Sequence, residues 1–260
     1  MIKIIYSIVL FLFSISAFAQ VEKIETDRPG ETNNPATVPK KWIQFESGFL
    51  RQTQTIGPEK DYYFQHPSLV TKYGIANRFE LRLITELASI KQGSFNGYST
   101  ITGIHNVQLG GKFNFLKEKG IRPKTSLIAH YDFHRLRTLY KGDSIDGANF
   151  RFAMLHTLSN TIVIGYNIGM KWNRFGSPPA YIYTFSPRFN IKEKWVAYIE
   201  VFGSFRKQKK YAPENSIGFG IAYYISDNVK IDGSAGFGLS KTAPDNFYAI
   251  GTSFRLNTNK

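Results

Sequence analysis

The sequence FELRLITEL at residues 79–87 alternates apolar side chains with charged or polar ones. Strand side chains point to opposite faces with a period of two. One face carries the apolar residues Phe79, Leu81, Leu83 and Leu87. The other face carries the charged residues Glu80, Arg82 and Glu86. This run therefore predicts a strand with one face toward an apolar medium and one toward water.

Eleven further runs of similar length recur along the chain. We expect strands at residues 42–52, 64–74, 79–87, 107–115, 125–133, 150–158, 162–172, 180–189, 195–205, 217–225, 229–239 and 247–256. Runs of about ten alternating residues are typical of transmembrane β-strands. No stretch after the first twenty residues reaches the length of apolar sequence that a spanning helix needs.

The connections between these runs alternate in length. Short links follow the even-numbered runs, as at residues 75–78 and 226–228, whereas long polar links follow the odd-numbered runs, as at residues 53–63 and 88–106. Bacterial outer-membrane barrels have short periplasmic turns and longer outer loops. The sequence predicts an all-β fold, a transmembrane antiparallel up-and-down β-barrel of about 12 strands (10–14), with both termini in the periplasm.

A soluble sandwich or lipocalin-like barrel is the competing interpretation, because periodicity alone does not say which face is inside. Three features favour the membrane barrel. They are an export signal, Gly and Ala on the polar faces, and aromatic residues near the expected strand ends. These aromatic residues are Trp42, Tyr73, Trp172, Trp195 and Tyr248.

The first residues predict export to the cell envelope. Lys3 precedes an apolar run at residues 4–15, and Ala17-Phe18-Ala19 is a small-x-small cleavage site, as in secretory signal peptides. We expect a signal peptide at 1–19, an N-terminal periplasmic or lumen-plugging segment at 20–41, and the outer-membrane barrel at 42–260. The absence of cysteine excludes disulfides and thiolate chemistry. An aromatic content of 15% with a mean hydropathy of -0.25 agrees with a barrel whose interior is polar.

Charged residues fall on the face that we expect to line the lumen. They are Glu46, Lys72, Glu80, Arg82, Glu86, Lys112, His130, Asp132, Arg151, Lys171, Arg188, Glu200, Lys230, Asp232 and Arg255. Charges that lose bulk water usually need a partner. These charged residues are therefore interpreted either as a structural ion network or as a lining that selects solutes. A lumen of this strand number is intermediate between filled and open barrels, which favours a narrow or plugged path.

The segment before the first strand contains three prolines, so it is not a central strand. It either enters the lumen from the periplasm or hangs free. If it enters, Asp27, Arg28, Pro29 and Glu31 form the expected plug, because Arg28 and Glu31 would find partners among the lumen charges.

Catalysis is the weaker hypothesis for this chain. His130 and Asp132 share a face, but a nucleophile with a base and an orienting group is not evident, and G-x-S-x-G is absent. The five histidines show no metal-ligand spacing, and we expect neither a metal nor a cofactor. The net charge of +14 has no nucleic-acid-binding module beside it. Basic outer loops, such as residues 206–210, favour outer-membrane lipids as partners instead.

Two motifs resemble a known family. The first is ETDRPGET at 25–32 with NP at 34–35, VPK at 38–40 and QFE at 44–46, and the second is YGIANRFELR at 73–82. They are similar to the opening and a hairpin of the transporter-like outer-membrane family named after the meta-pathway of phenol degradation. The sequence departs from the family pattern at Lys41, where Gly is common, and in the residues 257–260 that follow the last strand.

The resemblance implies uptake of small, often aromatic or hydrophobic compounds. The closing Gly251-x-x-Phe254-x-Leu256 is also similar to the signal that the barrel-assembly machinery reads. We therefore expect an outer-membrane barrel for passive passage of a small solute, not an enzyme. A non-transporting envelope barrel is the first alternative, and a barrel lipid hydrolase is the second.

Overall fold

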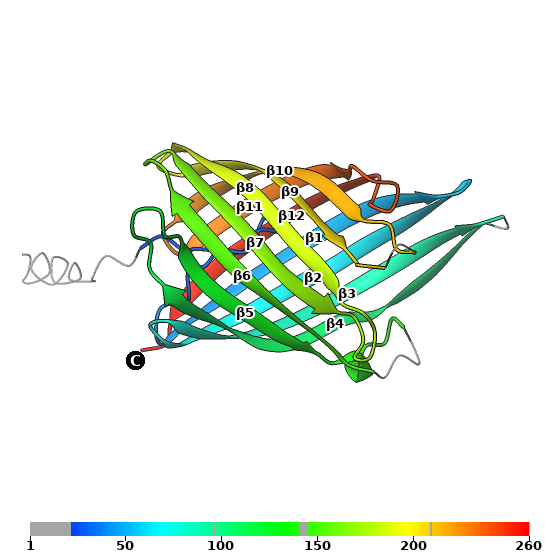
Figure 1. Ribbon diagram of the computed structural model, residues 1–260, viewed down its shortest axis with the longest axis horizontal. Coiled ribbons are helices and arrows are strands. Elements are labelled where there is room, and N and C mark those ends of the chain that lie inside the picture. The colour runs from blue at the N-terminus through cyan, green and yellow to red at the C-terminus, as the bar shows by residue number, and fades with distance from the viewer. Residues whose placement is uncertain (1–21, 96, 141–144, 209, 260) are drawn as a thin grey trace, which may run out of the picture.

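Twelve antiparallel strands form a closed barrel in the computed structural model, which describes residues 22–95, 97–140, 145–208 and 210–259 (Figure 1). The strands are β1 Trp42–Ile56, β2 Glu59–Ala76, β3 Phe79–Ser94, β4 Gly97–Leu116, β5 Lys124–Asp132, β6 Gly147–Thr157, β7 Ile162–Trp172, β8 Ala180–Lys192, β9 Trp195–Phe205, β10 Glu214–Ser226, β11 Val229–Gly238 and β12 Asn246–Asn257. A short 3-10 helix, η1 His134–Leu136, follows β5. The predicted signal peptide, 1–19, lies outside the described residues.

Each strand pairs with its neighbours in the sequence, and β1 closes the barrel against β12. This closing register runs from Trp42 opposite Asn257 to Thr53 opposite Asn246. Closure leaves no unpaired sheet edge, which a barrel in lipid requires because lipid offers no hydrogen bonds. The predicted up-and-down barrel is confirmed.

The polarity of the barrel is inverted relative to a water-soluble protein. Leu81 and Leu83 are each 42% exposed on the outer face, whereas Arg82, between them, is buried on the inner face with 2% exposed. Lys72 and Lys112 are among the largest completely buried side chains. This arrangement suits a lipid-facing exterior and excludes the soluble sandwich. Among the described residues, no helix is both long enough and apolar enough to cross a membrane.

Two of the predicted outer loops are wrong. Most of 53–63 belongs to β1 and β2, which meet in a two-residue turn at Gly57-Pro58, and most of 88–106 belongs to β3 and β4. Figure 1 shows these two hairpins projecting beyond the other strands, at the end opposite the C-terminus. Above the bilayer both faces of a hairpin meet water, so pairing continues although the hydropathy no longer alternates.

Candidate functional site

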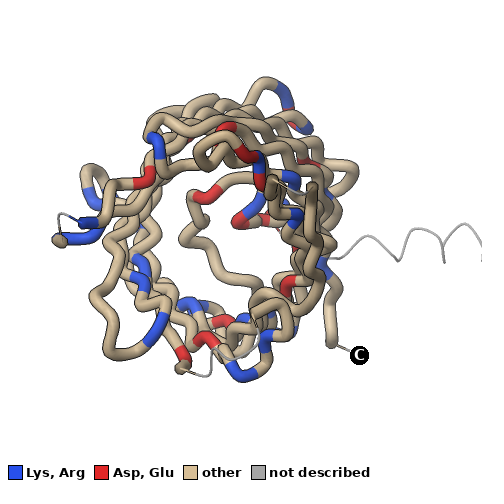
Figure 2. The backbone as a smooth tube through the Cα atoms, turned by 90° about the vertical axis from the view of Figure 1, so that its right-hand side faces the viewer, with Lys and Arg blue, Asp and Glu red and all other residues tan. Residues whose placement is uncertain are grey.

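Residues 22–41 enter the barrel lumen and leave it at the same end. The Ile24 N–H donates to Asp227 O in the β10–β11 turn at 2.8 Å, and the Lys41 N–H donates to Gly74 O beside the β2–β3 turn at 2.7 Å. Figure 2, seen from the end with the long hairpins, shows a loop of chain within the ring of strands. We call residues 25–38 the inner segment, because their partners are inward-facing residues from most of the strands.

Asp27 anchors the inner segment on the β2–β4 side of the barrel. Its carboxylate lies 2.6 Å from Lys72 Nζ, 2.7 Å from Arg82 Nη2 and 3.3 Å from Lys112 Nζ. Burial alone raises the pKa of the Asp27 carboxyl, but the charges of Arg82, Lys112 and Lys72 outweigh it and hold the pKa well below its ordinary value. With Glu46 and Glu80, three carboxylates balance three cations in a buried network.

Two glutamates of the barrel wall bind backbone amides of the inner segment. Glu46, on β1, accepts the Asp27 N–H at 3.0 Å and the Arg28 N–H at 3.2 Å. Glu200, on β9, accepts the N–H groups of Glu31 and Thr32 at 3.0 and 3.1 Å. Hydrogen bonds to a charged acceptor contribute about 1.5–3 kcal/mol each. The segment is therefore held at two points of the wall that lie four strands apart.

Two paired glycines make room for Arg28. Gly48 on β1 lies opposite Gly251 on β12, and a Cβ atom at either position would overlap the Arg28 guanidinium. Arg28 Nη2 also lies 3.0 Å from Asp232 Oδ1 on β11. The wall here lacks side chains where the inner segment approaches it closely, which is a common use of glycine.

The inner segment divides the lumen into two large cavities. A cavity of about 550 Å³ lies toward the long hairpins, where Arg28, Pro29 and Glu31 line it together with wall residues. A second cavity of about 770 Å³ lies toward the short turns, where Glu25, residues 36–39 and Arg255 line it. We call them the outer and the inner vestibule.

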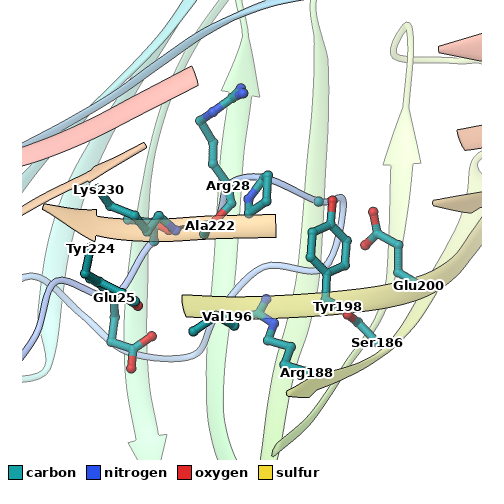
Figure 3. Close-up of a pocket in the computed structure, with 13 residues that line it drawn as sticks. Glu25, Arg28, Ser186, Arg188, Val196, Tyr198, Glu200, Ala222, Tyr224 and Lys230 are labelled. Carbon is teal, nitrogen blue, oxygen red and sulfur yellow. Dashed lines mark hydrogen bonds between the residues drawn. The ribbon is translucent and has the colours of Figure 1, made fainter. Parts of the chain in front are cut away.

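A neck of about 40 Å³ lies between the two vestibules, against strands β8 to β11. Figure 3 shows Arg28, Arg188, Tyr198, Glu200 and Lys230 around it. The neck shares Arg28 and Glu200 with the outer vestibule and Glu25 with the inner one. It is therefore a narrow zone between two wide ones.

The outer vestibule has an apolar strip that the sequence analysis missed. Its inward-facing apolar residues are Leu50, Val70, Ile84, Ile182, Phe202 and Phe247. Phe202 and Phe247 meet edge to face, with ring centroids 5.9 Å apart. The signal was weak because these strands carry apolar residues on both faces at this height, so alternation did not distinguish the inner face.

The fifteen charged residues that the sequence places inward lie in or beside this site. Those in contact with residues 22–41 are Glu46, Lys72, Glu80, Arg82, Lys112, Arg151, Arg188, Glu200, Lys230, Asp232 and Arg255. Glu86 and Lys171 line the outer vestibule. His130 bonds to Arg82, and Asp132 pairs with Arg137 at 2.6 Å.

The four expected plug residues differ in their roles. Asp27 is buried, Arg28 pairs with the wall, and Pro29 lines the neck. Glu31 holds the wall through its backbone N–H, whereas its side chain is exposed. The plug contacts thus come as much from backbone amides as from the predicted side chains.

The structure does not pair His130 with Asp132, the two residues on which the weaker catalytic hypothesis rested. His130 Nε2 accepts a hydrogen bond from Arg82 Nε at 3.1 Å, and His130 Nδ1 lies 3.2 Å from Asn149 Oδ1. Both ring nitrogens are thus engaged by residues other than Asp132. Within the described ranges, no group of three or more His, Asp or Glu side chains is arranged to hold a metal ion.

Solved structures with the same fold are outer-membrane channels, porins and translocators. An outer-membrane channel from Pseudomonas putida F1 has a TM-score of 0.65 at 11% identity, covering 88% of this chain and 99% of that one. The NanC porin has a TM-score of 0.56 at 10% identity, covering 82% and 100%. The translocator domain of the autotransporter NalP from Neisseria meningitidis scores 0.52 at 9% identity, covering 83% and 88%. The chain therefore has the fold of an outer-membrane channel.

The family model described as "Putative MetA-pathway of phenol degradation" matches residues 26–256. The chain belongs to this family, and the resemblance seen in its two motifs is confirmed. The match begins within the inner segment, so the family pattern includes nearly all of this segment as well as the barrel. A search of curated proteins finds no match.

Proposed function

We propose that this protein is an outer-membrane channel for passive passage of a small solute, and that the inner segment is its gate. The observation that carries the proposal is that the outer vestibule, the neck and the inner vestibule follow one another along the same lumen. A barrel that only anchors the envelope has no use for two wide, water-accessible cavities that face opposite sides of the membrane.

The neck is too narrow for an organic solute in this conformation. Its volume of about 40 Å³ has room for only a few water molecules, since a cavity needs about 10–15 Å³ to hold one. Passage of anything larger requires the inner segment to move away from β8 to β11. Loop displacement on the microsecond to millisecond scale is a common form of gating.

The outer vestibule supports an amphiphilic solute, such as a small aromatic acid. Its apolar strip offers edge and face contacts to a ring, whereas Arg151 and Lys171 offer charges to a polar substituent. The family description, with its reference to phenol degradation, points to the same class.

A reversible cross-link tests the gate. Thr32 Cγ2 lies 3.2 Å from where a Cβ would stand at Gly165 on β7, and the chain has no native cysteine. The variant Thr32→Cys/Gly165→Cys, in liposomes, should swell more slowly in arabinose and in benzoate after oxidation, and should recover with reductant. Both single-cysteine variants serve as controls under the same oxidant.

A variant that lacks residues 25–40 provides the second arm. It should swell faster than the parent and discriminate less between the two solutes. If liposomes with the deletion variant swell fast but the oxidised double-cysteine variant gives the same swelling rate as its reduced form, the channel proposal is supported and the gate proposal is refuted. If no variant supports swelling, the envelope-barrel alternative is correct.

A further inference from the structure

A groove of about 500 Å³ lies on the outside of the barrel, across β11, β12, β1 and β2. Two rows of outward-facing residues form it. One row runs from Gly233 through Ile250 to Phe49, and the next row, nearer the long hairpins, runs from Tyr248 through Arg51 to Phe64. The groove is separate from the lumen site and faces the bilayer.

The groove exists because large apolar side chains on the outer surface surround a position that has no side chain. Gly233 has no side chain in a row whose neighbours are Ile250 and Phe49. A Cβ at Gly233 would meet only Ala249 O, at 3.8 Å, so the space above it is open. On the other side, β2 bulges where His66 and Pro67 both face Phe49, and His66 lines the groove.

Two cations stand at the hairpin side of the groove. The Arg51 guanidinium lies 5.5 Å from the Tyr62 ring centroid, and Lys91 Nζ lies 4.4 Å from that of Tyr98. Within the part of the chain that the structure describes, neither cation forms a salt bridge with a carboxylate. Arg51 also lines the groove itself.

We propose that this groove binds one outer-leaflet lipid with a phosphorylated head group. An acyl chain fills the space over Gly233, between Phe49, Ile250 and Tyr248, and the phosphate meets Arg51, with Lys91 beside it. Guanidinium groups bind phosphate through two parallel hydrogen bonds, and lysine adds a point charge. A neutral lipid would leave both cations without an anion.

The position of the groove agrees with this occupant. The long hairpins mark the outer side of the membrane, and the cations lie on that side of the apolar rows. Basic residues at a membrane surface attract anionic head groups, and this attraction weakens beyond the screening length. Only a lipid supplies acyl chain and phosphate together at this height.

Lipid retention by the purified, detergent-solubilised barrel tests the proposal. The probe is phosphorylated lipid A, and the matched probe is the same lipid after enzymatic removal of its phosphate. Native mass spectrometry should find one phosphorylated lipid retained and the dephosphorylated lipid bound at least tenfold more weakly. Arg51→Gln should weaken binding of the phosphorylated lipid about tenfold, the factor expected for losing a charge-assisted contact.

Two further variants separate the groove from general charge attraction. Gly233→Leu fills the space without changing any charge and should abolish retention while the barrel still shows heat-modifiable migration. Arg206→Gln removes another outer guanidinium, 4.7 Å from the Tyr211 ring, and should change nothing. Equal losses for Arg206→Gln and Arg51→Gln would overturn the site, as would full retention by Gly233→Leu. Displacement of the lipid by millimolar inorganic phosphate would show a free-anion site instead.

Discussion

Asp27 forms three ion pairs with the barrel wall, more than any other side chain of the inner segment. One carboxylate receives Lys72, Arg82 and Lys112 from three neighbouring strands, and its own backbone N–H is held by Glu46. The sequence was sufficient to nominate Asp27 for a plug. It was not sufficient to find these partners, because they are brought together by strand stagger and by the path of residues 22–41, neither of which the alternation encodes.

The depressed pKa of Asp27 predicts how the proposed gate should respond to acid. A carboxyl whose folded-state pKa is lowered stabilises the closed segment fully above its ordinary pKa of about 3.9, and this stability is lost as the pH falls through the folded-state value. The stability that Asp27 supplies should therefore be fully present above about pH 4, and parent conductance should show a rise below that pH that depends on Asp27. Planar-bilayer recordings above and below this pH provide the measurement.

Asp27→Asn should abolish this acid step. The variant leaves three clustered cations short of one carboxylate, and breaking a buried ion pair costs about 3–5 kcal/mol. Its conductance should already be high at pH 7 and should change little on acidification. Superimposable pH profiles for the parent and Asp27→Asn would show that another group controls the gate.

At the scale of the strands, the period-two pattern was informative only inside the membrane. The expected bounds of β7 and β9 match the structure at both ends, whereas β2 and β4 extend well beyond the expected 64–74 and 107–115. Within lipid, one face must be apolar, so hydropathy marks the strand. Beyond the bilayer this constraint is lost, and only backbone pairing, which the sequence does not display, continues the strand.

Adjacent residues of β3 provide a test of which face meets lipid. Leu83 is 42% exposed on the outer face, and Ile84 lines the outer vestibule. Leu83→Arg should impair assembly, because an arginine facing lipid near the midplane costs about 2–4 kcal/mol. Ile84→Arg should assemble normally and change only solute passage. Heat-modifiable migration in gels measures assembly, and equal tolerance of both substitutions would contradict the assignment of faces.

At the scale of the whole molecule, the interior is held by charges and hydrogen bonds, and the apolar surface faces outward. This inversion explains why composition alone is ambiguous, since a mean hydropathy of -0.25 also fits a soluble domain. The decisive information is the combination of alternation with connection length. It predicted the barrel, but it predicted neither the vestibules nor the groove, because both depend on which side chains meet across strands.

Orientation is the property of the whole molecule that a labelling experiment tests directly. The turn between β1 and β2 and the turn between β6 and β7 lie at opposite ends of the barrel, and Pro58 and Asn160, in these two turns, are both exposed. With no native cysteine, Pro58→Cys and Asn160→Cys each carry one thiol. Because the long hairpins mark the outer side, a membrane-impermeant thiol reagent should label Pro58→Cys on intact cells. It should label Asn160→Cys only after the outer membrane is permeabilised. The reverse pattern would place the inner segment at the cell exterior, and the vestibules would then exchange their roles.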